Sequence, residues 1–417
     1  MGPIALFDKS FLQSLSVDEA VLFDHFFYPV ISPLFFVETL ADLEKAVREG
    51  RTPEQEVGNI AYKTPEMSGG PCAHHSRLAV ASLRGYPVPM DGRIPFAGGR
   101  PVDVDGKQGI IFDAPAEARA FSRWQNGEFL EVERQFAHNW RASLAAMDLK
   151  VVAEGMKSFG ITPQTCKSLE EAKRLADAVV SADGKHFDQM KIASFLFNIP
   201  RQYERPILER WSVAGYKPLS VYAPYAAHAV SVEVFFQITL AANLISSERS
   251  SNRVDVGYLF YLPFCMVFIS SDKLHRRCAP IYLRSDQEFI WGEDLKADLK
   301  ALNEYYSGVS DAEREKGIMS FASDPPKDGD FLVCQLWDRH LQPWRDRKPR
   351  VPLDPVQEKK LVDRLKRFTD APTAQLGQLS SATDNVEMVS IERRVHKRRG
   401  SWWQVPKDLK EEDKSKS

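Results

Sequence analysis

The most apolar stretch of the chain is residues 256–269, VGYLFYLPFCMVFI, which lies between Asp255 and Asp272. It is shorter than the about 20 residues that a helix needs to span a bilayer, and Pro263 divides it. The part before the proline suits a buried helix, and MVFIS after it suits a buried parallel strand. The pattern therefore predicts a helix, a tight turn and a strand, with one carboxylate near each end.

The N-terminal segment predicts two further strands. Residues 4–7, IALF, form a short apolar run that ends at Asp8, and YPVIS at 28–32 forms another. A helix begins after Ser16, and a second begins at Ser32-Pro33, a typical N-cap and first helical residue. Asp8 lies either at the carboxyl end of a strand, facing a site, or simply caps the following turn.

The helix after the second predicted strand carries Glu38 among Phe35, Phe36, Val37 and Leu40, and its pattern extends to Gly50. A solvated surface glutamate is seldom surrounded in this way, so Glu38 is a candidate site residue.

The composition and the hydrophobic pattern change twice in the middle of the chain. Residues 51–115 are rich in Gly and Pro and predict loops with short strands, whereas 115–220 have apolar residues at helical spacing. In this region Trp124, Trp140 and His138 are interpreted as core residues. Cys72, His74 and His75 lack a second cluster at zinc spacing and are set aside as a metal site.

A long apolar helix is predicted at 225–245, and Glu233 on it is a secondary candidate site residue. Beyond the opening stretch, RRCAPIYL at 276–283 predicts another strand. The segment from Glu288 to Tyr306 predicts a helix, with Gly292 near its start.

Composition and net charge argue against some functional classes. The chain has 417 residues, 43% hydrophobic and 27% charged, with a formal net charge of −2, so no global attraction to nucleic acid is expected. Its five cysteines form no CxxC pair, which favours a reducing compartment over a disulfide framework. The first residues lack a basic n-region. We expect a cytoplasmic protein without a membrane segment.

The candidate acids have similar positions relative to the predicted strands. Each follows a predicted strand or lies in a helix next to one, so a parallel sheet would bring them to its carboxyl edge, where ligands bind in open α/β sheets. Carboxylates packed closely repel one another, and a hard divalent cation relieves that repulsion. The sequence thus predicts a Mg²⁺ or Mn²⁺ site made by Asp8, Glu38, Asp255 and Asp272.

This arrangement resembles the PIN-domain family of metal-dependent ribonucleases. The matching segments are ALFDKSFL, ISPLFFVETLADL, NRVDVGYLFYL and VFISSDKLH, and the spacing of Asp255 and Asp272 is the most specific part. The resemblance implies an α/β, Rossmann-like parallel sheet flanked by helices. The chain departs from the family in having far more residues between Glu38 and Asp255, which predicts a large, mainly helical insertion.

The resemblance implies a nuclease that hydrolyses RNA phosphodiester bonds through a carboxylate-held metal ion. Ser270 and Ser271 would position a ligand or phosphate, and four residues just past the last acid would contact the nucleic-acid backbone: Lys273, His275, Arg276 and Arg277. The alternative is a non-catalytic binding or regulatory protein with the same fold, whose insertion is the interaction surface.

The C-terminal tail combines cations with aromatics. Arg398, Arg399, Trp402 and Trp403 suit phosphate contacts and base stacking, but a tail whose tryptophans dock on the protein's own surface fits the pattern equally well. The predicted organisation is a first part of the sheet domain, an insertion, a second part of the sheet domain, a helical extension and a tail, at 1–50, 51–222, 223–306, 307–390 and 391–417.

Overall fold

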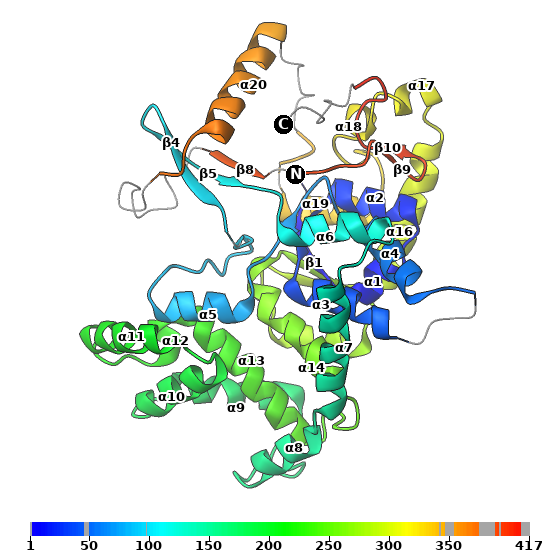
Figure 1. Ribbon diagram of the computed structural model, residues 1–417. Helices are drawn as coiled ribbons and strands as arrows, with labels where there is room; N and C mark the ends of the chain where they lie inside the picture. Colours follow the sequence, from blue (N-terminus) through cyan, green and yellow to red (C-terminus); the bar gives the residue numbers. More distant parts are fainter. Residues whose placement is uncertain are drawn as a thin grey trace.

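The computed structural model describes residues 2–45, 50–96, 98–341, 343–346, 354–374, 388–391 and 393–409. In Figure 1 the central strands lie between helices on both faces, and the green helices α8 to α12 gather at one end of the molecule. Helix α20 and the β4–β5 hairpin lie at the opposite end. The protein is an α/β fold with a parallel sheet flanked by helices, as the sequence predicted.

The central sheet has five strands in the order β3-β2-β1-β6-β7, and every neighbouring pair is parallel. The first two strands are where the apolar runs predicted them, and so is the strand after Pro263. The strands are β1 (Ile4–Phe7), β2 (Tyr28–Ile31), β3 (Gly70–Pro71), β6 (Val267–Ser270) and β7 (Glu288–Trp291).

Successive residues of each strand point to opposite faces of the sheet, so the strands divide the interior into two cores. Leu6, Val30 and Phe268 face one core, and their neighbours Phe7 and Ile269 face the other. Because both faces are covered, the strands are apolar without alternation, as buried parallel strands usually are.

The core on the Leu6 side is mainly helical and centres on the long buried helix α13 (Pro224–Ala241). The other elements that contribute to it are α5 (His75–Leu83), α8 (Leu149–Lys157), α9 (Leu169–Ser181), α10 (His186–Leu196), α11 (Arg201–Val213), α12 (Leu219–Tyr222), α14 (Asn252–Gly257), the 3₁₀ helix Tyr258–Phe264, α15 (Lys273–Cys278) and the 3₁₀ turn Ala279–Ile281.

The core on the Phe7 side joins helices from both ends of the chain. They are α1 (Lys9–Ser14), α2 (Val17–Phe26), α3 (Pro33–Leu40) with the 3₁₀ turn Ala41–Glu44, α4 (Pro53–Lys63), α6 (Ala116–Gln125), α7 (Glu131–Ala146), α16 (Gly292–Ser307), α18 (Ile318–Phe321) and α19 (Leu332–His340). The short helix α17 (Asp311–Arg314) precedes α18 and buries no side chain.

Two smaller sheets involve strands of the C-terminal part. Strands β4 (Arg100–Val104), β5 (Lys107–Phe112) and β8 (Met388–Ile391) form one, which α20 (Pro355–Asp370) covers through Phe368. Strands β9 (Arg398–Arg399) and β10 (Trp402–Trp403) pair as a hairpin.

Three predictions about segments were wrong, one of them the helix from Glu288, which begins only at Gly292. The run 276–283 is not a strand, because the Asp272 side chain caps α15 at the Leu274 N–H, and the fifth strand is EFIW at Glu288–Trp291. The predicted insertion does not begin at residue 51, because the first part of that segment belongs to the sheet domain. Strand β3 pairs with β2, and Val57 of α4 and Trp124 of α6 belong to the core on the Phe7 side.

Candidate functional site

All four predicted acids line one cavity at the carboxyl edge of the central sheet. Asp8 directly follows β1, Glu38 lies in α3 after β2, Asp255 lies in α14, and Asp272 is the second residue after β6. Their cavity, called here the acid pocket, has a volume of about 270 Å³. It is also lined by Lys9, Ser10, Gln13, Ala41, Lys45, Trp140, Arg141, Leu144, Ser251, Val254, Tyr258 and His275.

Asp8 is held firmly at the floor of this pocket. One carboxylate oxygen accepts from the Phe11 N–H at 2.9 Å, which caps α1, and the other accepts from the hydroxyls of Ser10 and Ser270, each at 2.7 Å. Burial acts to raise the pKa of Asp8, but its hydrogen bonding and the charge of His275 outweigh burial and lower it. Asp8 is thus both a helix cap and a site residue, which unites the two interpretations left open.

His275 is the buried cation of the pocket. Its Nε2 lies 2.7 Å from the Asp255 carbonyl, which can only accept, so Nε2 carries a proton. Its Nδ1 lies 2.7 Å from Ser270 Oγ. The Ser270 hydroxyl donates its single proton to Asp8, so Oγ accepts from Nδ1–H and from the Asp272 N–H.

Both ring nitrogens therefore donate, which defines an imidazolium. Burial acts to lower the pKa of His275, but Asp8 and Asp255 outweigh it and raise the pKa to about 9. Since His275 is only 1% exposed, its predicted role as a contact to a nucleic-acid backbone is wrong. It neutralises acids inside the pocket instead.

Glu38 occupies a second wall. Its Oε2 accepts from the Tyr258 hydroxyl at 2.5 Å, and burial raises its pKa, with Lys9 acting in the opposite direction. Lys9 donates to the Glu38 carbonyl at 3.2 Å and to both oxygens of Asp42 at 2.9 Å.

Asp255 differs from the other three acids, because no described residue donates a hydrogen bond to its carboxylate. Burial raises its pKa to about 7; His275 opposes this rise, while Asp272, Glu38 and Asp8 add to it. A carboxyl group with this pKa exchanges protons readily at neutral pH, and perturbed groups of this kind concentrate at functional sites.

Helix α7 closes the side of the pocket, a contribution that the sequence did not reveal. Trp140, Arg141 and Leu144 line the cavity, although Trp140 was interpreted as a core residue. Arg141 is fixed by the Ala41 carbonyl at 3.0 Å and by Asp42 at 3.2 Å. Lys9, next to Asp8, was detectable as a cation beside a candidate acid. Trp140 and Arg141 were not, because about a hundred residues separate them from the acids.

The donor chemistry fits a hard divalent cation, since these metals prefer carboxylate oxygens. Asp255 is free to serve as a ligand, whereas one oxygen of Asp272 accepts from Leu274 at 2.6 Å. Within the described residues, no group of three or more His, Cys, Asp or Glu side chains is arranged as a metal site. The pocket therefore has the right donors, with Asp8 and Glu38 engaged in bonds inside the protein.

The secondary candidates lie around the pocket and do not line it. Glu233 pairs with Arg253 at 2.7 Å. The Ser271 hydroxyl is buried and has no hydrogen-bond partner among the described residues; it packs so close to Gly292 that a Cβ there would lie 2.1 Å away. Lys273, Arg276 and Arg277 are exposed just past Asp272.

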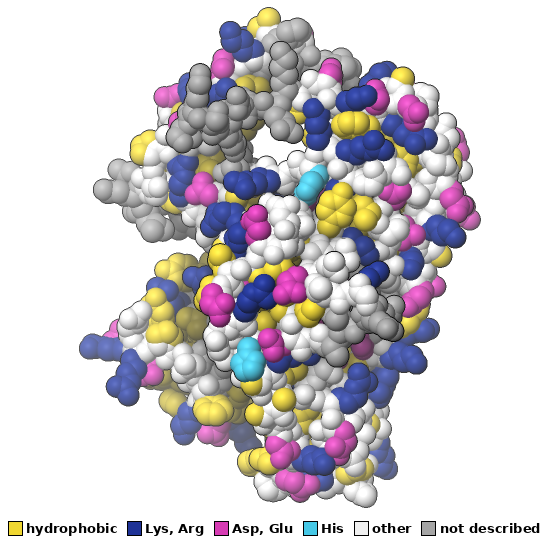
Figure 2. Space-filling view, turned by 45° about the vertical axis from the view of Figure 1, so that its right-hand side comes forward, with side chains coloured by type: hydrophobic (Ala, Val, Ile, Leu, Met, Phe, Trp, Pro, Cys, Tyr) yellow, Lys and Arg dark blue, Asp and Glu magenta, His cyan; other side chains and the backbone are white. Residues whose placement is uncertain are grey.

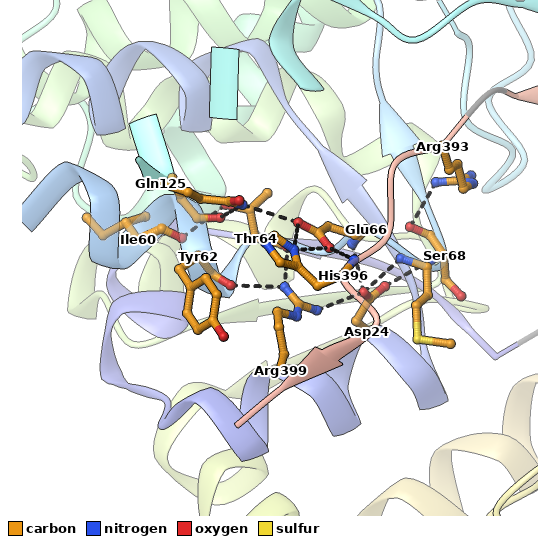
Figure 3. Close-up of polar contacts among 12 residues, drawn as sticks. Asp24, Ile60, Tyr62, Thr64, Glu66, Ser68, Gln125, Arg393, His396 and Arg399 are labelled. Atoms are coloured by element: carbon orange, nitrogen blue, oxygen red, sulfur yellow. Dashed lines mark hydrogen bonds and ion pairs between the residues drawn. The ribbon is translucent and has the colours of Figure 1, made fainter. Parts of the chain in front are cut away.

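The C-terminal tail docks on the body of the protein. Arg399 is fully buried, pairs with Asp24 at 3.2 Å and donates to the carbonyls of Tyr62 and Thr64, as Figure 3 shows. Trp402 is 1% exposed, and its Nε1 donates to Asn303 at 2.9 Å. The prediction that Arg399 and Trp402 bind nucleic acid is therefore wrong, because neither side chain is accessible.

Their neighbours Arg398 and Trp403 remain outside the interior and form a cation–π pair, 5.5 Å from the guanidinium carbon to the ring centroid. On the face shown in Figure 2, Lys and Arg side chains are interspersed with Asp and Glu, and neither sign covers a continuous field. This agrees with the small net charge.

No family model, curated protein or solved structure matches this chain. Among the described helices, none combines the length and the apolar character needed to cross a bilayer.

Proposed function

We propose that the protein is a PIN-like nuclease that uses a carboxylate-held Mg²⁺ or Mn²⁺ to hydrolyse phosphodiester bonds, most naturally of RNA. The observation that carries this proposal is the acid pocket itself. Four acids from four separate segments line one cavity at the carboxyl edge of the sheet, and the Asp255 carboxylate has no hydrogen-bond donor among the described residues. A half-buried carboxylate without a donor costs folding free energy, and a site that binds a cation explains its presence.

Each side chain has a part in this proposal. Asp255 and Asp272 would hold the ion, with Glu38 and Asp8 completing the negative surroundings. The ion, when bound, supplies Lewis-acid stabilisation and lowers the pKa of water. His275 and Ser270 keep Asp8 ionised and oriented, Ser270 accepts from the Asp272 N–H, and His275 donates to the Asp255 carbonyl.

The cations at the pocket wall suit a phosphodiester substrate. Lys9, Lys45 and Arg141 all line the cavity, and Asp42 lies within 4.0 Å of each of them. Asp42 is buried, so it fixes the geometry of these cations without filling the pocket. Cations beside an acid floor allow the phosphate to be bound while the carboxylates hold a metal ion.

The test is cleavage of single-stranded RNA and DNA in Mn²⁺ by the wild type and by Asp255→Asn, with Glu233→Gln as the matched control. Glu233 carries the same charge and is partly buried, but it lies outside the pocket. We expect Asp255→Asn to lose roughly 100-fold or more of the cleavage rate, and Glu233→Gln to retain it. Equal cleavage by the wild type and Asp255→Asn would show that the activity belongs to another site or a contaminant.

A second candidate is the non-catalytic binding protein, and one observation favours it. The helices α8 to α11 and the turns that follow them expose large apolar side chains, including Phe159 at 81%, Phe195 at 85% and Val213 at 90%. Exposed apolar side chains mark an interaction surface where they form a contiguous patch. Titration calorimetry separates the candidates, because this function predicts no Mn²⁺ binding at millimolar concentration, and the nuclease predicts binding that Asp255→Asn abolishes.

A further inference from the structure

Helix α7 presents an aromatic pair at the mouth of the acid pocket. Trp140 lines the cavity, and Phe136, one helical turn earlier, lies against it with ring centroids 6.3 Å apart and planes 14° apart. Phe136 is 42% exposed. The two nearly parallel rings form an aromatic surface on α7 that runs from the exposed Phe136 to Trp140 at the cavity wall.

The aromatic pair is not what anchors α7 to the protein. The neighbouring face of the helix does that: Glu133 is buried and accepts from Trp124 Nε1 at 3.1 Å, Ala137 is fully buried, and Arg141 bonds to the Ala41 carbonyl. These anchors lie at i, i+4 and i+8 and so share one side of the helix. Trp140 and Phe136 are therefore available for a ligand.

Cations stand beside this surface. Lys45 is 55% and Arg141 38% exposed at their side chains, and the buried Asp42 contacts both. A flat aromatic surface next to two partly exposed cations is complementary to a nucleotide, whose base stacks and whose phosphate is anionic. A membrane or a protein partner would not require this pairing of features.

We propose that Trp140, extended by Phe136, is the stacking platform for an unpaired base of a single-stranded nucleic acid, with Lys45 and Arg141 holding the adjoining phosphate. The proposal rests on the nuclease function and specifies its substrate class. In a duplex both faces of each internal base are already stacked, so the platform selects single strands and leads the chain toward Asp255 and Asp272.

The experiment measures binding of a fluorescein-labelled single-stranded RNA of about 12 nucleotides in EDTA, by fluorescence anisotropy, with the duplex of the same sequence alongside. We expect Trp140→Ala to bind the single strand about tenfold more weakly than the wild type, since stacking contributes this much per base. Trp140→Phe keeps a stacking face and should bind within a few-fold of the wild type.

Phe187→Ala is the matched control, because Phe187 is an exposed aromatic residue of α10 that packs on Trp211 and Tyr216, outside the acid pocket, and it should bind as the wild type does. Equal single-strand affinity of Trp140→Ala and the wild type overturns the proposal, as does equal affinity of the wild type for duplex and single strand. Circular dichroism melting checks that Trp140→Ala is folded. If Trp140→Ala does not fold, the single-strand affinity of Trp140→Phe is compared with that of the wild type instead.

The outcomes separate this inference from the proposed function. If the protein binds single strands through Trp140 but does not cleave them, the stacking proposal stands and the nuclease proposal is wrong. If cleavage depends on Asp255 and Trp140→Ala binds with unchanged affinity, the nuclease proposal stands and the stacking proposal is wrong.

Discussion

Two carboxylates of this protein, the fully buried Asp24 and the half-buried Asp255, have opposite surroundings. Asp24 in α2 accepts three backbone N–H groups, from Glu66, Met67 and Ser68, at 2.7 to 2.9 Å, and also pairs with the buried Arg399. Asp255 in the acid pocket accepts from no described donor and has other acids as its nearest charged neighbours besides His275. The Asp24 carboxylate is fully hydrogen-bonded and ion-paired, whereas the Asp255 carboxylate has the charge of His275 nearby but no hydrogen-bond donor among the described residues.

This difference distinguishes the structural acid Asp24 from the candidate site acid Asp255 better than burial does. Asp24 uses its charge to join α2, the 66–68 segment and the C-terminal tail (Figure 3). Asp255 joins no segments through its carboxylate, and burial only makes its charge costly. The comparison predicts that substitutions around Asp24 change stability, and substitutions of Asp255 change ligand binding.

The largest expected effect is on the surroundings of Asp24. Arg399→Met removes the cation while leaving Asp24 buried, and breaking a buried pair in this way costs about 3–5 kcal/mol. We expect that loss in the free energy of unfolding, measured by urea denaturation. Arg398→Met, at the exposed neighbouring position, should change stability by less than about 0.5 kcal/mol. A loss below about 1 kcal/mol in Arg399→Met would mean that the tail contributes little to the fold.

The next effect concerns two buried histidines, one near each acid. Burial lowers the pKa of His25 from its usual 6.5 to about 4, whereas Asp8 and Asp255 raise that of His275 to about 9 against the effect of burial. His25 is therefore neutral in the fold. The stability linked to it is present above pH 6.5 and is lost as the pH falls through 6.5 toward 4. The stability linked to His275 is present below pH 6.5 and is lost as the pH rises through 9.

The shift at His25 corresponds to about 3 kcal/mol between these limits. His25→Gln should therefore flatten the decline in unfolding free energy between pH 6.5 and 4.5, measured by denaturation at a series of pH values. His138→Gln, at a position with a 64% exposed side chain, should leave the slope unchanged. Identical slopes for His25→Gln and the wild type would place the acid sensitivity elsewhere.

The smallest effect on stability is at Asp255 itself. Its pKa of about 7 lies above the usual 3.8, so the fold disfavours the charged form, and stability falls as the pH rises from 3.8 through 7. Asp255→Asn removes that cost and should stabilise the protein at pH 8 by about 1–2 kcal/mol, allowing for partial exposure of the group.

Added Mn²⁺ should make the wild type more stable than Asp255→Asn. Because a ligand that binds only the folded state raises its stability, Mn²⁺ should raise the melting temperature of the wild type but not that of Asp255→Asn. Glu248→Gln, whose side chain is 69% exposed and pairs with Lys150, should respond as the wild type does. An equal rise in the melting temperature of Asp255→Asn would show that Mn²⁺ does not bind in this pocket.

Local patterns predicted the sheet well where strands are continuous and apolar. IALF, YPVI and VFIS pair side by side, as predicted, and Ser16 and Ser32 cap their helices. EFIW was assigned to a helix, because four residues before a strong helical pattern carry no independent signal. Strand β3, only Gly70–Pro71, has no apolar run at all, and its pairing with β2 is decided by the fold.

The sequence alone determined which acids meet. Asp8, Glu38, Asp255 and Asp272 each occupy a fixed place relative to a strand, and parallel strands bring such places to one edge. Only the tertiary structure decided what surrounds them. It placed the His275 imidazolium beneath Asp8, left Asp255 without a donor among the described residues, and brought Trp140 and Arg141 to the pocket wall. The reason is physical: strand position is a local property, whereas charge compensation depends on side chains that approach from distant parts of the chain.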